Sequence, residues 1–158
     1  MNQDKKEFMA EAIRLADENL KTGKGGPFGA VVVQNGVIVG KAGNSVTSTN
    51  DPTAHAEVNA IRDACKNLNT FQLDDCEIYT SCEPCPMCLG AIYWARPKKV
   101  YYACTKADAA DAGFDDSFIY EEINIPLNER KIPATQLMQT EAQKVFAAWK
   151  ELDAKIEY

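Results

Sequence analysis

The fold is decided by residues 77–104, EIYTSCEPCPMCLGAIYWARPKKVYYAC. The pattern predicts one strand from Glu77 to Thr80 and another from Val100 to Cys104, both rich in β-branched and aromatic residues. Between them, Pro84-Cys85-Pro86 is expected to open a helix that ends near Arg96-Pro97. A strand, a helix and a strand in this order are typical of α/β proteins.

The residues before this stretch predict a helix followed by a hairpin. From about Asp4 to Lys21, apolar residues recur at helical spacing with charges between them, which indicates an amphipathic helix. Strands are expected from Ala30 to Val33 and from Val37 to Gly40. Asn35-Gly36 between them is the dipeptide favoured in two-residue hairpin turns, so these two strands should pair antiparallel.

The remaining elements are predicted from capping residues and periodicity. A polar stretch from Asn44 leads to Asp51-Pro52, which should cap and begin a helix that runs to about Leu68. Beyond the fourth strand we expect a loop from Asp108 to Asp116, then a short Ile- and Tyr-rich element and a final helix over about residues 140–154.

These elements predict one domain over residues 1–158, an α/β fold arranged as a three-layer α-β-α sandwich with a mixed central sheet. In open α/β sheets the active site lies at the carboxyl ends of the strands. His55 follows the second predicted strand and the cysteine-rich stretch follows the third. The functional site is therefore expected at this edge of the sheet.

The composition excludes several classes of protein. The chain has 158 residues, 17 Lys and Arg against 23 Asp and Glu, and a net charge of −6, which argues against an extended nucleic-acid surface. No apolar run approaches the ~20 residues that a bilayer span needs. We expect no signal peptide and a cytoplasmic location, where six cysteines point to metal binding or reactive thiols rather than disulfides.

Three residues form a candidate metal site. Cys85 and Cys88 share one face at the start of a predicted helix, where the partial positive charge favours the thiolate that binds metal. The single histidine, His55, adds a nitrogen, and one nitrogen with two sulfurs suits zinc. Three ligands leave a fourth position for water, unless Cys82 closes the site as a structural ligand, and a redox role for the Cys85-Cys88 pair is a further alternative.

Glu57 is the candidate proton carrier. It lies two residues after His55, so both are expected in the first turn of their helix, where they can face one spot. Zinc lowers the pKa of a bound water to ~7, and a nearby carboxylate can accept that proton and pass it on. Because no second histidine exists in the chain, a carboxylate must do this work.

The two motifs His55-Ala56-Glu57 and Pro84-Cys85-Pro86-Met87-Cys88 resemble the signature of the zinc nucleoside and nucleobase deaminases. The resemblance implies the cytidine-deaminase-like fold. It also implies that water replaces an exocyclic amine with the help of Zn²⁺, while Glu57 carries protons to the leaving ammonia.

Longer segments are similar to the bacterial guanine deaminase group, which implies conversion of guanine to xanthine. The segments are GGPFGAVVV, NSVTSTNDPTAHAEV, TSCEPCPMCLGAIYWARPK and AGFDDSFIYEEI. The group's pattern implies Asp116 as a second acidic residue of the reaction, which would accept the N–H donors of guanine. It also implies base contacts from Asn44, Phe28 and Ala56, with Phe28 stacking on the purine.

In that group the C-terminal segment is exchanged between two subunits. The resemblance therefore implies a homodimer in which residues from about 140 to 158 cross over and Tyr158 covers the partner's pocket. Phe146, Trp149 and Leu152 form a helical stripe that is expected to pack in the core or at a subunit contact. The other cysteines, Cys65 and Cys104 among them, are expected to be small buried hydrophobes.

Three alternative functions stay open. Adenosine deaminases that act on transfer RNA share both zinc motifs, but the charge of −6 offers little for phosphates. Cytosine deaminases use the same metal ligands without the role given to Asp116. A non-catalytic zinc module is the third alternative, although a purely structural site has no use for Glu57.

Overall fold

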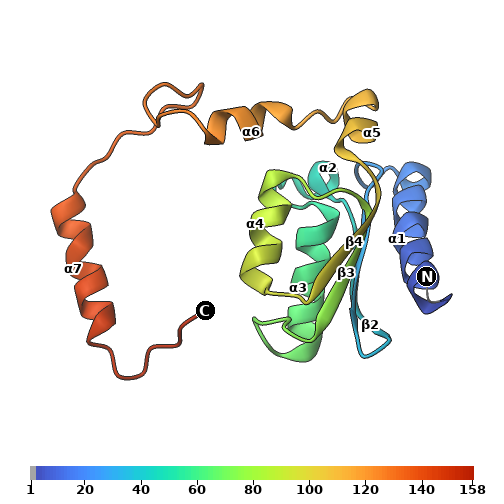
Figure 1. The fold of residues 1–158 in the computed structure, drawn as a ribbon, viewed down its shortest axis with the longest axis horizontal. Helices are drawn as coiled ribbons and strands as arrows, with labels where there is room; N and C mark the ends of the chain where they lie inside the picture. The colour runs from blue at the N-terminus through green and yellow to red at the C-terminus, as the bar shows by residue number, and fades with distance from the viewer. Residues whose placement is uncertain (1–2) are drawn as a thin grey trace. The chain divides into compact units, whose positions relative to one another are not determined.

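The computed structural model describes residues 3–158, which divide into two compact units. The first unit ends at Asp116 and the second spans Ser117–Tyr158. Figure 1 shows the chain from the N-terminal helix α1 (Gln3–Thr22) to the C-terminal helix α7 (Gln139–Lys150). Within the described residues, no helix has both the length and the apolar character needed to cross a membrane.

The first unit is built on a four-stranded sheet. The strands are β1 (Gly29–Gln34), β2 (Val37–Gly43), β3 (Cys76–Cys82) and β4 (Lys99–Cys104), in the order β2-β1-β3-β4. Strand β1 pairs antiparallel with both of its neighbours, whereas β3 and β4 run parallel. The predicted mixed sheet is confirmed.

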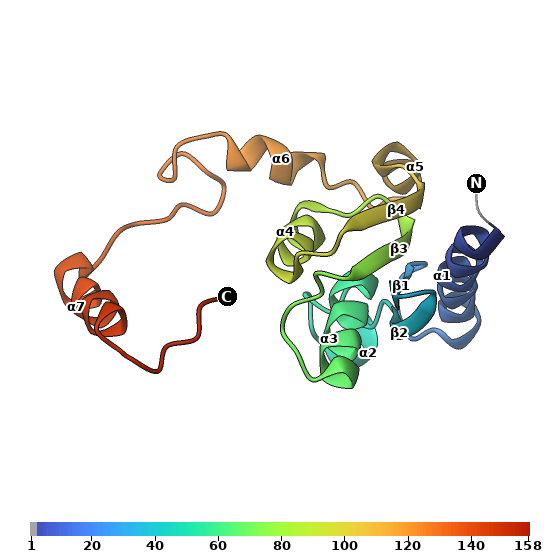
Figure 2. The ribbon, with the colours of Figure 1, turned by 60° about the horizontal axis from the view of Figure 1, so that its bottom comes forward.

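Helices cover both faces of this sheet. Helix α1 packs on one face, where Phe8 and Leu15 contact Val31 and Tyr79. Helices α3 (Ala56–Leu68) and α4 (Pro86–Ala95) lie on the other face (Figure 2), over a core that includes Ile78. The predicted three-layer α-β-α arrangement is therefore confirmed for the first unit.

The hairpin between β1 and β2 forms as predicted. Asn35 and Gly36 both have positive φ values, 50° and 80°. Two consecutive positive φ values define a type I′ turn, whose twist matches that of the flanking strands. Asparagine and glycine tolerate this conformation better than other residues.

The helix expected to begin at Pro52 begins instead at Ala56, with His55 as its N-cap. Asp51 does not cap this helix, because its Oδ1 accepts from the backbone N–H of Thr53 at 2.8 Å and from the Thr53 hydroxyl at 2.7 Å. Asp51 thus forms an Asx turn with Thr53, two residues later, instead of the predicted helix cap. The polar stretch before it contains a short helix that was not predicted, α2 (Val46–Thr49).

The loop expected from Asp108 to Asp116 is partly wrong, because α5 (Lys106–Asp111) occupies its beginning. Thr105 and Asp108 form a capping box: the Asp108 carboxylate accepts from the Thr105 N–H at 2.7 Å and the Thr105 hydroxyl accepts from the Asp108 N–H at 3.3 Å. Residues 112–116 form the connection that carries Asp116.

The second unit contains α6 (Ser117–Ile123), at the place of the expected Ile- and Tyr-rich element, and α7. The predicted final helix is confirmed, although it ends at Lys150 rather than near residue 154. Across residues 117–158, all of which are described, no side chain is buried. Phe146 is 70% exposed and Trp149 is 40% exposed, so their stripe is not core within this chain.

All six cysteines are free thiols. The expectation of a buried residue is wrong for Cys104, which is exposed because β4 is the edge strand on this side of the sheet. Cys65 lies on α3, is partly buried and packs against the core, and Cys76 is fully buried.

Candidate metal centre and active site

The two ligand cysteines lie at the N-terminus of α4. Cys85 is the N-cap residue, Pro86 occupies the first turn, and the Cys88 backbone N–H donates to Cys85 Sγ at 3.5 Å. The helix begins here because Pro86 has a φ value that suits the first turn and no N–H to leave unpaired. Strand β3 ends at Cys82, so this helix start stands at the carboxyl end of the strand, as predicted.

His55 brings its ring to the same place from the N-cap position of α3. Its Nδ1 atom lies 3.5 Å from Cys85 Sγ and 3.5 Å from Cys88 Sγ. The three ligand atoms all lie within 4.8 Å of one another. Tetrahedral zinc with ordinary bond lengths sets a nitrogen and a sulfur ligand about 3.5 Å apart. The cluster therefore fits Zn²⁺, which these three residues would hold.

The electrostatics of the cluster favour a thiolate. A hydrogen bond from Cys88, helped by His55, lowers the pKa of Cys85 to about 4. The hydrogen bond to Cys85 and burial raise the pKa of Cys88. The partial positive charge at the start of α4 acts in the same direction as the lowered pKa of Cys85.

Cys82 does not join this cluster. The group of ligand atoms found among the described residues consists of His55, Cys85 and Cys88. The thiol of Cys82 is buried and donates instead to the Thr105 carbonyl at 3.6 Å. A closed four-ligand site through Cys82 is therefore not supported, and one coordination position is left for a water or a substrate.

Glu57 lies beside the metal ligands in the first turn of α3, and it is 6% exposed. Its Oε2 accepts from the Cys88 thiol at 3.4 Å and its Oε1 accepts from the Thr80 hydroxyl at 3.3 Å. Burial raises the pKa of this carboxyl group. A carboxyl group whose pKa lies above its usual range is better suited to accept and release a proton near neutral pH.

Asn44 follows β2 and is buried. Its Oδ1 accepts from the backbone N–H groups of Gly26 at 3.2 Å and Val46 at 3.1 Å. The backbone donors fix which end of the amide is the oxygen. Asn44 is thereby held against the glycine-rich loop that precedes β1.

Asp116 is partly buried at the end of the first unit. Burial raises its pKa, and the negative charge of Cys85 raises it further. Two residues before Asp116, the ring of Phe114 meets that of Phe28 edge to face, with centroids 4.9 Å apart. Phe28 itself packs against the core cluster.

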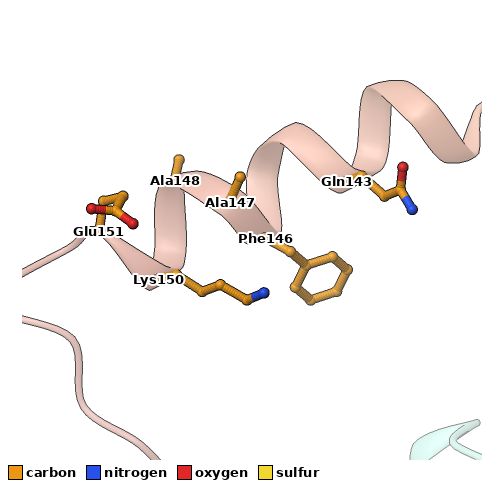
Figure 3. Close-up of a pocket in the computed structure, with 6 residues that line it drawn as sticks. All are labelled: Gln143, Phe146, Ala147, Ala148, Lys150 and Glu151. Atoms are coloured by element: carbon orange, nitrogen blue, oxygen red, sulfur yellow. The ribbon is translucent and has the colours of Figure 1, made fainter.

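The two other predicted site residues are in different surroundings. Ala56 is fully buried and its methyl group belongs to the core, so its predicted contact with a base rests on the backbone N–H at the start of α3. Tyr158 lies in the second unit and is 70% exposed. A shallow hollow in that unit is lined by α7 and the adjacent Glu151, and it contains none of the candidate site residues (Figure 3).

Sequence reasoning missed three residues that support the site. Thr80 contacts Glu57, Ser81 accepts from the Gly29 N–H at 3.0 Å, and Asn19 reaches the backbone of Asn44. Thr80 lies on the same face of β3 as Ile78, so strand alternation alone suggests only a core position for it. Asn19 lies on the apolar face of a long amphipathic helix, and a buried amide there needs hydrogen-bond partners. Its position in the sequence pattern is the signal that could have identified it.

Comparison with known proteins agrees with this geometry. Residues 2–104 match the family described as the cytidine and deoxycytidylate deaminase zinc-binding region. This range contains His55, Glu57, Cys85 and Cys88, together with the whole sheet. The chain belongs to this family of zinc-dependent deaminases.

Individual relatives extend the comparison to the whole chain. The guanine deaminase of Bacillus subtilis is 60% identical over 96% of this chain and 97% of its own length. The crystal structure of guanine deaminase from Bacillus subtilis superposes with a TM-score of 0.95 at 59% identity, covering 100% of this chain and 99% of that one. The tRNA-specific adenosine deaminase of Aquifex aeolicus is 44% identical over 63% of this chain and 65% of its own length.

Proposed function

We propose that this chain catalyses the hydrolytic deamination of guanine to xanthine and ammonia. The observation that carries the proposal is the similarity to the Bacillus subtilis guanine deaminase, which runs over nearly the full length of both chains. The tRNA-specific relative, in contrast, shares only about two thirds of the chain. The net charge of −6 also favours a free base over a polyanionic substrate.

The chain's own residues divide the work of this reaction. His55, Cys85 and Cys88 would hold Zn²⁺, which would supply Lewis-acid activation of a water molecule when bound. Glu57 accepts a proton from the attacking water and delivers it to the departing amine, which leaves as ammonia while the water oxygen stays on the ring carbon. The contact with Thr80 keeps one carboxylate oxygen in place while the other faces Cys88.

Base selection is assigned to residues around this centre. Asp116 provides an acceptor for the N–H groups at N1 and N2 of guanine, and it takes part in the proton transfers as a second acid. Cytosine and adenine offer a ring acceptor where guanine offers a donor, so either would leave the carboxylate unpaired at a cost of ~1–3 kcal/mol. Asn44 hydrogen-bonds the base, Phe28 stacks on it, and Ala56 contacts it through the backbone.

We also infer a homodimer in which the C-terminal segments are exchanged. The second unit buries none of its own side chains, although it carries Val145, Phe146 and Trp149 on α7. Such apolar groups are favoured at contacts with another chain. In this arrangement Tyr158 covers the pocket of the partner subunit.

The free thiols of all six cysteines support a reducing, cytoplasmic location.

The proposal is tested by ammonia release from zinc-loaded protein given guanine, cytosine, adenine, guanosine or transfer RNA in separate reactions. We expect release from guanine, with xanthine as the other product. Release from a different substrate alone would keep His55, Glu57, Cys85 and Cys88 in their roles but reject the role of Asp116. No release from any substrate, with zinc bound, would favour the structural zinc module instead.

A further inference from the structure

Asn19 connects the N-terminal helix to two segments that border the active site. Its side chain is buried on α1, and its Nδ2 donates to the backbone carbonyl of Gly26 at 2.9 Å and to that of Asn44 at 2.7 Å. Both amide hydrogens are therefore used, each on a different loop. We propose that Asn19 is a positioning residue that sets the location of Asn44 for base binding, an inference that rests on the proposed function.

By holding the backbone of Asn44, Asn19 keeps the Asn44 side chain in a fixed orientation. The two N–H groups that donate to Asn44 Oδ1 come from Gly26 and Val46. Among the described residues, none accepts a hydrogen bond from the Asn44 side-chain amine. This amine is a donor that a ring nitrogen of a purine, an acceptor, can meet.

The loop contacted by Asn19 has little freedom to compensate. The Asn44 N–H donates to the Phe28 carbonyl at 3.0 Å, and the Phe28 N–H donates to the Gly26 carbonyl at 2.8 Å, the same oxygen that Asn19 contacts. A methyl group at Gly25 would stand 2.2 Å from the Asn44 carbonyl oxygen, so only glycine fits there. Asn44, the loop and α1 form one closely packed hydrogen-bonded unit.

Loss of the Asn19 donors has a specific consequence. Two buried or partly buried carbonyl groups lose a partner, and the backbone of Asn44 can shift away from α1. The zinc ligands and Glu57 lie in α3 and α4 or at the N-caps of these helices, and among the described residues they have no hydrogen bond to this unit. The effect should therefore fall on binding of the base and much less on proton transfer.

The test compares zinc-loaded wild type with Asn19→Leu, which keeps a similar volume and removes both donors. We expect KM for guanine to rise about tenfold or more, with kcat changed less than about threefold and zinc retained. Asn19→Ser, which keeps one shorter donor, should give an intermediate KM and serves if the leucine variant does not fold. The matched control is Asn67→Leu, because Asn67 also donates to a backbone carbonyl, that of Val39 at 2.8 Å, but from an exposed position.

A double-mutant cycle separates positioning from a general loss of stability. In the Asn44→Ala background, Asn19→Leu should raise KM by less than about twofold, because the group it positions is already gone. The inference would be overturned if Asn19→Leu raised KM equally in both backgrounds. It would also be overturned if KM were unchanged in Asn19→Leu and Asn19→Ser alone. Wild type that does not convert guanine would instead reject the proposed function, so the two failures are distinguishable.

Discussion

The hydroxyl of Thr80 donates to Glu57 Oε1 across 3.3 Å, and both side chains are buried beside the metal ligands. Thr80 comes from β3 and Glu57 from the first turn of α3, so the sheet itself orients the carboxylate that carries protons. The other carboxylate oxygen faces the Cys88 thiol at 3.4 Å. Because Cys88 would bind Zn²⁺ as a thiolate, the Thr80 hydroxyl is the donor that continues to hold this carboxylate when the metal is bound.

Replacement of Thr80 by valine should therefore slow the reaction without removing zinc. Thr80→Val keeps the shape of the side chain and removes the donor, and we expect kcat to fall about tenfold, in line with the effect of other groups that orient a metal centre. Thr80→Ser keeps the donor and should retain most of the activity. Steady-state rates with guanine and zinc content by atomic absorption are the measurements. Equal activity of the serine and valine variants would show that the hydroxyl does not matter.

Asp116 is expected to act on the base. Asp116→Asn replaces a charged acceptor with a weaker one, so kcat/KM for guanine should fall about tenfold to a hundredfold. The neighbouring variant Asp115→Asn is the matched control and should stay within about twofold of wild type. If both variants behave alike, the loss of activity comes from the charge of the loop and not from contact with the substrate.

Removal of residues 155–158 tests the role of the C-terminus. If Tyr158 covers the pocket of a partner subunit, the shortened chain should lose about tenfold in kcat/KM, as for loss of one aromatic contact residue. It should remain a dimer by light scattering, because the apolar residues of α7 are still present. Full activity of the shortened chain would remove Tyr158 from the site, and a monomeric full-length protein would reject the exchanged dimer.

Stability should depend on pH through Glu11. Hydrogen bonds from Arg14, supported by Lys41, lower the pKa of Glu11 from 4.5 to about 2. A group whose pKa is lower in the folded state stabilises the protein above its unfolded pKa and loses this effect as the pH falls toward the folded pKa. The Tm difference between wild type and Glu11→Gln should therefore be present at pH 6 and shrink steadily below about pH 4.5. Glu7→Gln, on the same helix, is the control, and a difference that grows with acid would contradict the assignment.

The sequence was sufficient for features that depend on local pattern. The Asn35-Gly36 turn and the proline after Cys85 each specify one backbone geometry, so the hairpin and the start of α4 could be predicted. The start of α3 could not be predicted. The Asp51 side chain can accept a hydrogen bond either as a helix N-cap or from Thr53 in an Asx turn, and tertiary packing decides between the two. Helix α5 was not predicted, although Thr105 and Asp108 have the spacing of a capping box.

The candidate site followed the same division. His55, Glu57, Cys85 and Cys88 could be found because metal chemistry restricts both residue type and spacing. Thr80 and Asn19 could not be found in this way. Their roles come from hydrogen bonds to residues that lie 23 and 25 positions away in the sequence. Such contacts exist only after the sheet and α1 have come together.

Zinc titration of metal-depleted protein, with xanthine formation from guanine as the readout, tests the central claim most directly. Activity should rise in proportion to bound zinc and level off at one ion per chain, because His55, Cys85 and Cys88 form the one such cluster of ligands within residues 3–158. The Glu57→Gln variant should bind zinc with the same stoichiometry while its rate stays at least about a hundredfold lower. Wild type that binds one zinc ion per chain and forms no xanthine would contradict the account.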